Sequence, residues 1–582
     1  MNTLYTLIPY LKRHRTTIGI GSLFLVLTSA FQMAGPWILK LAFDGLESSI
    51  TKQELLVYAG ILVAIAIVAG ICRFFMRRLL IGTSREIEYE LRQDFFRKLT
   101  VLSFSYYNRT PTGDLMARAT NDLTAVRMVL GPGVMYTMTT VITLTASVTL
   151  MALLSWKLML ISLAPMPLIS LFMYLYGGMI HKRFESVQEQ FASITARAQE
   201  YLAGIRVVRA YGQEESAKEE FSNQNQEYLD RYMKLVRING LMHPSIRFLA
   251  GTATILVLLF GGIMVMNETI SLGDFVAFFA YLNMLIWPMI ALGWVVSIFQ
   301  RGAASMKRIN YVFNSEAEIV DSPHAVDKED LQGAIEFRDV HFTYRTRPDE
   351  SVLRGINLKI EPGETIGIAG RTGSGKTTLV NLIPRLFAPD KGEILIDGSP
   401  ITHFTLNTLR NHIGYVPQEA FLFSRTLAEN IRYGEPEASQ DAIENAAELA
   451  QLSGDVSEFP KTYETAVGER GVTLSGGQKQ RAAIARAVIR SPRILILDDA
   501  LASVDTRTEE AILGGLRSYM SNRTTLLVAH RVSTLKLADR IVLLENGQIT
   551  EMGTHDELVA KGGAYAELAR MQELKDQLEA TS

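Results

Sequence analysis

The stretch Gly370-Arg371-Thr372-Gly373-Ser374-Gly375-Lys376-Thr377-Thr378 decides the fold of the second half of this chain. An apolar, strand-like run at 365–369 precedes it, and a helical pattern follows from Leu379. A glycine-rich loop between a strand and a helix is the context of the phosphate-binding loop, whose backbone N–H groups surround a polyphosphate. In such a loop Lys376 reaches the β- and γ-phosphates, and the Thr377 hydroxyl completes the coordination of Mg²⁺. The sequence therefore predicts a nucleotide site here.

The composition averages two unlike parts of a chain that is long enough for two or more domains. Of the 582 residues 48% are apolar, but long uncharged runs fill the first part, and the second has a soluble α/β pattern. The formal charge of -2 gives no indication of nucleic acid as a partner. The single cysteine, Cys72, excludes a disulfide framework, and we expect it to be buried in its apolar run. The N-terminus has no signal-peptide cleavage pattern.

Six segments in the first half contain no Asp, Glu, Lys or Arg. Each reaches or approaches the roughly 20 residues that cross a bilayer core. Buried helices of a soluble protein do not account for so many such runs, so the sequence predicts six transmembrane helices. The segments are Thr16–Leu39, Leu55–Cys72, Met128–Trp156, Leu158–Ile180, Phe248–Asn267 and Phe275–Gln300.

Lysine and arginine gather at one end of these segments, and this end is expected in the cytoplasm. The connections at the other end are short or acidic, including a tight turn at Trp156-Lys157. We therefore expect a multi-pass protein of the cell membrane, in bacteria the inner membrane, with both termini and the second half cytoplasmic. The basic residues are Lys12, Arg13 and Arg15 before the first segment, Arg77, Arg78 and Arg85 after the second, Lys182 and Arg183 after the fourth, and Arg301, Lys307 and Arg308 after the sixth.

Two long charged stretches, after the second and the fourth segments, keep a helical apolar periodicity. Packed helical extensions into the cytosol explain this periodicity better than solvated linkers. The first is predicted to turn at Thr112–Arg118, after Pro111, and the second near Ala210–Glu214. The expected domains are a transmembrane domain at 1–313, a polar linker at 314–332 and a nucleotide-binding domain at 333–582.

Two further motifs in the second half suit a nucleotide. The apolar run Ile494–Leu497 is typical of a buried parallel strand, which delivers Asp498 and Asp499 to the ligand edge of a sheet. Asp498 would hold Mg²⁺, directly or through water, and Asp499 would polarise the attacking water. Tyr344 follows a strand-like pattern, and its spacing leaves an adenine-stacking ring and a core aromatic equally open.

The segment Leu474-Ser475-Gly476-Gly477-Gln478 opens a second glycine-rich helix N-terminus. Such an N-terminus can bind phosphate. One ATP does not need two such loops from one fold. Dimerisation, with the loop of one copy closing over nucleotide held by the other, is the economical explanation.

Together with His530 in Leu527–Arg531, these motifs resemble those of ATP-binding-cassette transporters, and six spans ahead of one cassette resemble an exporter half-transporter. The resemblance implies an all-α six-helix transmembrane domain followed by an α/β P-loop domain, with ATP and Mg²⁺ as cofactors. It also implies roles for individual residues. These are nucleotide binding for Tyr344, Gly370, Arg371, Thr372, Gly373, Ser374, Gly375, Lys376, Thr377 and Thr378; catalysis for Asp499, His530 and Gln418; metal binding for Thr377, Gln418 and Asp498; action on a partner's ATP for Ser475, Gly476, Gly477 and Gln478; and an inter-subunit loop around Asp505. The segment Thr465–Gly471 resembles the family's cross-talk segment, and the two predicted turns its coupling helices.

The chain departs from the family pattern at two places. Asp499 stands where the family has Glu, and Ala502-Ser503-Val504-Asp505 replaces Ser-Ala-Leu-Asp. A carboxylate misplaced by about 1 Å can cost ~10²-fold in rate. Both changes resemble the subunit of a heterodimeric exporter whose own site hydrolyses ATP poorly. The alternative is a homodimer in which Asp499 suffices.

The sixth span is rich in aromatic residues and methionine, such as Phe278, Tyr281, Met284 and Trp287. A cavity of this kind suits hydrophobic or amphipathic compounds, although each residue alone fits lipid-facing or packing bulk as well. Export of such compounds is the function that the resemblance implies. A homodimeric flippase of lipids or lipid-linked substrates is the alternative, and an ATP-gated regulator is less expected. An importer is disfavoured by analogy, and a soluble ATPase of DNA repair or translation by the six spans.

Overall fold

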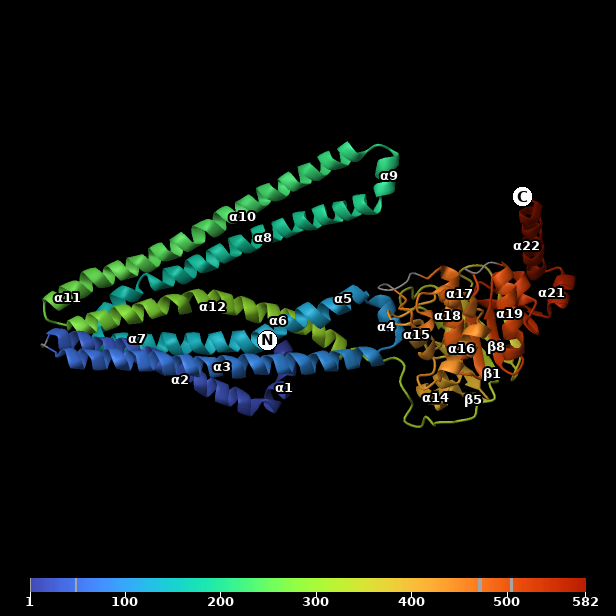
Figure 1. Ribbon diagram of the computed structural model, residues 1–582, viewed down its shortest axis with the longest axis horizontal. Coiled ribbons are helices and arrows are strands. Elements are labelled where there is room, and N and C mark those ends of the chain that lie inside the picture. The colour runs from blue at the N-terminus through green and yellow to red at the C-terminus, as the bar shows by residue number, and fades with distance from the viewer. Residues whose placement is uncertain (1, 48–49, 469–473, 503–505, 582) are drawn as a thin grey trace. The chain divides into compact units, whose positions relative to one another are not determined.

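The computed structural model describes residues 2–47, 50–468, 474–502 and 506–581 (Figure 1). Contacts within the chain divide it into two compact units. The first unit contains residues 1–100 and 113–315, and the second contains 101–112 and 316–582. The second unit thus includes the short segment 101–112, which in the sequence stands between two helices of the first unit.

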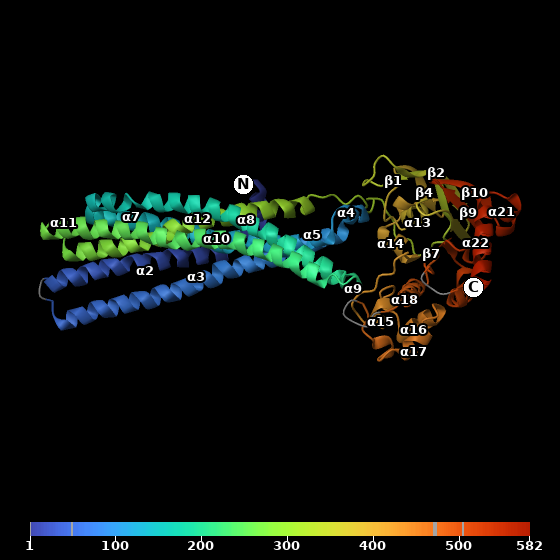
Figure 2. The ribbon, with the colours of Figure 1, turned by 90° about the horizontal axis from the view of Figure 1, so that it is seen from above.

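The first unit is built of helices, and six of those that the structure describes are 30 or more residues long. Figures 1 and 2 show α8 and α10 lying side by side, with α9 joining their ends. The helices are η1 (Asn2–Leu7), α1 (Ile8–Arg13), α2 (Arg15–Glu47), α3 (Lys52–Val101), α5 (Thr112–Ala117), η2 (Arg118–Asp122), α6 (Leu123–Met128), η3 (Val129–Gly133), α7 (Val134–Leu163), α8 (Met166–Ala203), α9 (Ile205–Ala210), α10 (Glu214–Leu256), η4 (Val257–Gly261), α11 (Gly262–Met266) and α12 (Leu272–Phe313).

Five helical stretches among the described residues are long and apolar enough to cross a membrane. They are Arg15–Glu47, Lys52–Val101, Thr112–Leu163, Glu214–Met266 and Leu272–Phe313. They contain the first, second, third and sixth predicted spans, and the fifth except for its last residue, Asn267. The fourth predicted span, Leu158–Ile180, begins at the end of α7 and continues in α8. It is not among the five and stays a prediction. The backbone of α7 leaves the helical region at Ser155, next to the tight turn predicted at Trp156-Lys157.

The core of the first unit forms where α12 packs against α2 and α7. Tyr281 of α12 is fully buried, and its hydroxyl donates to the backbone oxygen of Met33 at 2.8 Å. Tyr281 and Phe278 therefore pack helices together, whereas Trp287 in the same helix is exposed. Cys72 is free and buried, as predicted.

The first of the two predicted turns lies upstream of its predicted position. Residues 112–117 form helix α5, and the chain reverses before it, around α4 (Phe104–Arg109). The residue before a proline avoids the helical region, and Thr110 is extended, with φ -120° and ψ 111°. Pro111 therefore marks the start of a new helix, not the entry to a turn. The second turn, around α9, overlaps its predicted position at Ala210 and reverses at Gly212, with φ 61°.

The second unit contains two sheets with helices around them. The larger sheet has the strand order β10-β9-β3-β8-β7-β6, parallel except for β10. The smaller sheet is antiparallel, with the order β2-β1-β4-β5. The strands are β1 (Ile335–Thr343), β2 (Ser351–Ile360), β3 (Thr365–Ala369), β4 (Lys391–Ile396), β5 (Ser399–Pro400), β6 (Ile413–Val416), β7 (Ile494–Asp498), β8 (Thr524–Val528), β9 (Arg540–Glu545) and β10 (Gln548–Gly553).

Helices lie around these strands, in the segments that connect one strand to the next. They are α4, α13 (Lys376–Leu382), η5 (Ile401–His403), α14 (Leu406–Asn411), α15 (Leu427–Arg432), α16 (Gln440–Leu449), α17 (Ser453–Glu458), η6 (Thr462–Glu464), α18 (Gly476–Val488), α19 (Thr506–Met520), α20 (Val532–Leu535), α21 (His555–Lys561) and α22 (Ala564–Thr581). The strands β3, β7 and β8 are buried along their whole lengths, as their continuous apolar runs predict for a parallel sheet with both faces covered.

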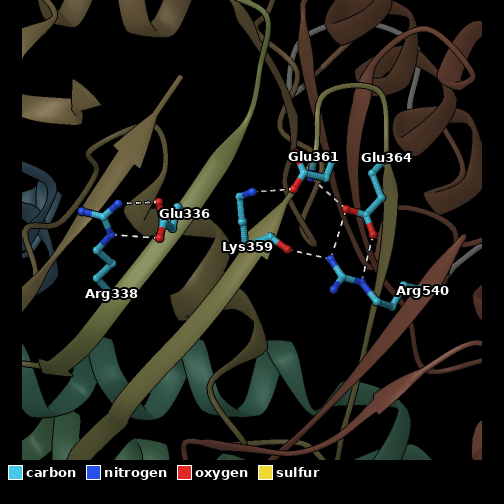
Figure 3. A network of polar contacts seen from close by, with 6 residues as sticks. All are labelled: Glu336, Arg338, Lys359, Glu361, Glu364 and Arg540. Carbon is cyan, nitrogen blue, oxygen red and sulfur yellow. Dashed lines mark hydrogen bonds and ion pairs between the residues drawn. The ribbon is translucent and has the colours of Figure 1, made fainter. Parts of the chain in front are cut away.

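A hydrogen bond flanked by ion pairs connects the two sheets (Figure 3). The guanidinium of Arg540 in β9 lies 2.9 Å from the Glu364 carboxylate, which precedes β3, and also donates to the backbone oxygen of Lys359 in β2 at 2.6 Å. Lys359 in turn pairs with Glu361 at 2.7 Å. These contacts hold the start of β3 in place, and the nucleotide loop follows directly at its end.

Candidate nucleotide site

The loop 370–375 leaves the carboxyl end of β3 and enters α13. Gly373 and Gly375 have φ values of 84° and 103°, which residues with a side chain rarely adopt. A Cβ atom at Gly370, whose φ is 149°, would overlap the backbone oxygen of Leu544. The glycines therefore allow the loop to fold tightly against β9 and leave its backbone free to surround a ligand.

Lys376 closes this loop. Its side chain is only 6% exposed, and Nζ donates to the backbone oxygens of Gly370 and Arg371 at 2.8 and 3.0 Å. Burial lowers the pKa of Lys376, while the nearby carboxylates of Asp499 and Asp498 act in the opposite direction. The ammonium group is thus held inside the loop, beside the position where phosphate oxygens would enter.

Thr377 and Asp498 form a pair at the floor of the site. The Thr377 hydroxyl donates to Oδ1 of Asp498 at 3.0 Å, and Asp498 is 1% exposed. Its second oxygen, Oδ2, is buried and has no hydrogen-bond partner among the residues that the structure describes. Burial raises the pKa of Asp498, and the Thr377 hydrogen bond opposes this. A hydroxyl and an unsatisfied carboxylate oxygen are the donors that Mg²⁺ prefers, so these residues fit the ion.

Asp499 turns away from the strand into a left-handed conformation, with φ 50°. Its N–H donates to the backbone oxygen of Val528 at 2.9 Å, and its Oδ2 accepts from Nε2 of Gln418 at 3.4 Å. The two side chains predicted to act on water and metal therefore lie together.

Tyr344 is partly a core aromatic, and its adenine-stacking role stays a prediction. Its ring packs edge-on against Phe342 and Phe387, with ring centroids 4.9 and 5.3 Å apart, and so belongs partly to the core. Its hydroxyl lies 2.9 Å from the Thr378 hydroxyl in α13, and the ring also borders the cavity described next. Burial raises the pKa of Tyr344.

One cavity of about 410 Å³ collects most of the predicted site residues. Gly370, Arg371 and Ser374 belong to the same loop but do not line it. Five lining residues were not predicted, Thr346, Arg347, Glu350, Val352 and Val528. For the first three, the signal in the sequence is the polar segment that follows Tyr344. The predicted residues that line the cavity are Tyr344, Thr372, Gly373, Gly375, Lys376, Thr377, Thr378, Gln418, Asp498, Asp499 and His530.

The second glycine-rich segment lies outside this cavity. Ser475 caps α18, accepting from the Gln478 N–H at 3.2 Å, while Gln478 Oε1 accepts from the Ser475 N–H at 2.9 Å. Gln478 also donates to Asp455 at 3.0 Å, so the helix N-terminus is rigidly built. Gly476 and Gly477 form the first turn of α18. Asp505, with Ser503 and Val504, and residues 469–471 of the predicted cross-talk segment lie outside the described residues.

The fold and the cavity define a P-loop ATPase, because the nucleotide loop, paired aspartates and His530 meet at the carboxyl ends of parallel strands. In the same chain, this ATPase follows a region of long apolar helices. Residues 18–289 match the family described as "ABC transporter transmembrane region", and residues 353–502 match "ABC transporter". The chain belongs to the ABC transporter family.

Similar proteins extend over nearly the whole chain. The chain is 38% identical, over 97% of both chains, to "Probable multidrug resistance ABC transporter ATP-binding/permease protein YheI" of Bacillus subtilis (strain 168). It is also 38% identical to "Multidrug resistance-like ATP-binding protein MdlA" of Escherichia coli (strain K12), covering 98% of this chain and 96% of that protein. A third relative, "ATP-dependent lipid A-core flippase" of Syntrophus aciditrophicus (strain SB), is 33% identical over 99% of this chain and 96% of its own.

One membrane region and one ATPase in a single chain make this protein an ABC exporter half-transporter, a multi-pass membrane protein whose ATPase activity is coupled to transport.

Proposed function

We propose that this half-transporter exports hydrophobic or amphipathic compounds across the cell membrane as one half of a dimer. The observation that carries the proposal is the cavity in which Lys376, Asp498 and His530 meet, in a chain whose described residues include five helical stretches apolar enough to cross a membrane. Two full-length relatives with multidrug resistance in their names support this substrate class. Both termini and the ATPase then lie in the cytoplasm, in bacteria at the inner membrane, because the basic residues flank that side of the spans.

The cavity residues divide the chemistry between them. The Lys376 ammonium, already desolvated in its loop, exchanges the carbonyls of Gly370 and Arg371 for oxygens of the β- and γ-phosphates. Thr377, Asp498 and Gln418 are the residues that would hold Mg²⁺, which when bound neutralises phosphate charge. Tyr344 stacks on the adenine, His530 contacts the γ-phosphate, and Asp499 orients the attacking water. The remaining loop residues supply backbone N–H groups to the phosphates.

A second proposal concerns the partner. Asp499 carries a carboxylate one methylene shorter than glutamate, and Gln418 lies next to it at 3.4 Å. The segment Ser475–Gln478 is complete and capped. We propose that this chain pairs with a different half-transporter, serves the partner's ATP with Ser475, Gly476, Gly477 and Gln478, reaches it through the loop with Asp505, and hydrolyses its own ATP slowly.

A homodimeric flippase is the second candidate function. The 33% identical relative named as a lipid A-core flippase supports it, since the similarity covers 99% of this chain. In that case the substrate is a lipid or a lipid-linked compound, and Asp499 alone activates water in both sites.

Transport in proteoliposomes tests these proposals. The purified assembly is reconstituted with a hydrophobic fluorescent dye in one series and a labelled phospholipid in another. We expect ATP-dependent dye accumulation, which falls when Lys376 is replaced in Lys376→Ala. Lipid translocation without dye transport would favour the flippase, and undiminished transport by Lys376→Ala would contradict a role for this cavity.

A further inference from the structure

Glu318, in the segment that follows α12, binds side chains from two other parts of the second unit. Its Oε1 lies 3.2 Å from Nη2 of Arg109 and 3.1 Å from Nη1 of Arg345. The Ser105 hydroxyl donates to its other oxygen, Oε2. Ser105 and Arg109 belong to α4, whereas Arg345 follows Tyr344 directly in the chain. One carboxylate therefore ties α4 to the residue next to the proposed adenine-stacking ring.

A second connection between α4 and Tyr344 is aromatic. Phe104 of α4 packs edge-on against Phe387, with ring centroids 5.6 Å apart, and Phe387 packs in the same way against Tyr344 at 5.3 Å. Tyr344 itself contacts Thr378 behind the nucleotide loop. The ionic and the aromatic contacts border one cavity of about 130 Å³. Tyr344 lines this cavity and the nucleotide cavity alike.

Both ion pairs, from Arg109 and from Arg345, are made with the Glu318 carboxylate. Exposed ion pairs contribute little when each stands alone, and the side chains of Arg345 and Arg109 are 65% and 43% exposed. The Glu318 side chain is only 25% exposed and accepts from three donors. Charge-assisted bonds to one shared acceptor act as a unit. Loss of its charge therefore releases α4 and Arg345 at once.

We propose that Glu318 is a positioning residue that couples nucleotide occupancy at Tyr344 to α4. The inference rests on the proposed function, in which adenine stacks on Tyr344. A nucleotide that displaces Tyr344 also moves Arg345, and Glu318 transmits this displacement to Arg109 and Ser105. Since α4 continues in the chain into α3 on one side and α5 on the other, the displacement reaches two membrane-region helices.

The experiment compares Glu318→Gln with Glu316→Gln in the full-length reconstituted assembly. Glu316 lies two residues earlier in the same segment, and Arg109, Arg345 and Ser105 bind Glu318 and not Glu316, so its variant is the matched control. We expect Glu318→Gln to lower the number of substrate molecules moved per ATP by at least about five-fold, as for loss of a coupling energy. Its KM for ATP and its substrate-free ATPase rate stay near wild type. An unchanged ratio, or a ratio lowered equally by Glu316→Gln, overturns the proposal.

A spin label at Asn108→Cys of α4, in a Cys72→Ser background, supplies a readout without any transported substrate. We expect ATP to change the label's mobility in wild type but not in Glu318→Gln, although both bind ATP equally. An ATP response that persists in Glu318→Gln also overturns the proposal. Failure of wild type to bind ATP at all would contradict the proposed function instead, so the two failures are distinguishable.

Discussion

At the scale of single residues, the site is defined by two neighbouring aspartates with different surroundings. Asp498 is buried, pairs with Thr377 and keeps one oxygen unsatisfied. Asp499 has a left-handed backbone, which aspartate tolerates better than most residues, and faces Gln418 at the cavity. The surroundings of Asp498 suit a cation and those of Asp499 suit a water molecule. We therefore make a separate prediction for each carboxylate.

Replacing Asp499 tests the reach of its carboxylate. We expect Asp499→Glu to raise the ATP turnover of the purified chain by about ten-fold or more, because the added methylene brings the carboxylate nearer the attacking water. Asp499→Asn is the control of similar size and lowers turnover further. Initial rates of phosphate release at saturating MgATP measure the effect. Equal rates for Asp499→Glu and wild type would show that reach does not limit hydrolysis.

The raised pKa of Asp498 predicts a pH-dependent stability of the nucleotide-free protein. A carboxyl whose pKa is higher in the folded state stabilises the fold below its unfolded pKa of about 3.9, and this contribution is lost as pH rises through the folded pKa. At neutral pH Asp498→Asn should therefore melt at a higher temperature than wild type. This advantage should shrink as pH falls toward about 4.

Thermal unfolding of both proteins across this pH range, followed by circular dichroism, measures the difference. Asp330→Asn, at an exposed position outside the cavity, is the control. An advantage of Asp498→Asn that grew on acidification would contradict the assigned cause. The same variant should also lose stabilisation by MgATP, since the carboxylate that fits the ion is gone.

At the scale of elements, short-range backbone rules place both the nucleotide loop and α4. Pro111 forces Thr110 into an extended conformation, which ends α4 at Arg109 and starts α5 at Thr112. In the nucleotide loop, left-handed glycines bring the backbone against β9. The loop therefore depends on the absence of side chains at chosen positions.

Three alanine variants separate backbone strain from steric overlap in this element. Gly370→Ala introduces both backbone strain and steric overlap, because φ is 149° and its Cβ would overlap the backbone oxygen of Leu544. We expect this variant to lose about 2–4 kcal/mol of unfolding free energy. Gly373→Ala has φ 84° but open space around it, so a loss of about 1–2 kcal/mol is expected. Gly454→Ala in α17 has open space and helical backbone and should cost nothing. Denaturant titration of each variant measures these values, and equal losses for Gly370→Ala and Gly373→Ala would contradict the overlap.

At the scale of the whole molecule, the two units are interleaved along the chain. Residues 101–112 belong to the second unit although they are flanked by α3 and α5 of the first. Covalent continuity thus links the ATPase to the membrane region at α4 as well as after α12. The glycine-rich segment of α18 lies outside the nucleotide cavity of its own chain, which is the basis for proposing that it acts on a partner's ATP.

The proposed heterodimer, with one slow and one competent ATP site, can be tested on the native assembly. This assembly is purified from the protein's own cells through a tag on this chain. In a heterodimer, Gly477→Asp in this chain should nearly abolish ATP turnover, because it damages the segment that serves the competent site of the partner. Lys376→Ala should lower turnover only in part, since it affects the slow site. Phosphate release from the two assemblies, purified in parallel, is the measurement. Equal and complete loss in both variants would indicate a homodimer instead.

The sequence by itself determined the family, the ATPase fold and most of the cavity. These features depend on neighbours in the chain. A strand, a glycine-rich loop and a helix follow one another at 365–382, and a buried apolar strand carries Asp498 at its end. The approximate place of the second turn and five of the six spans followed from local patterns in the same way.

Only the tertiary structure decided which distant segments meet. Arg347 and Glu350 enter the nucleotide cavity, and α4 joins the second unit through contacts between residues far apart in the chain, such as Arg109 with Glu318. Local sequence patterns do not predict such contacts, because each of these charged residues looks in the sequence like any other charged residue on a protein surface. Folding of the sheets and the linker brings them together, and this is why the proposed coupling through Glu318 was visible only in three dimensions.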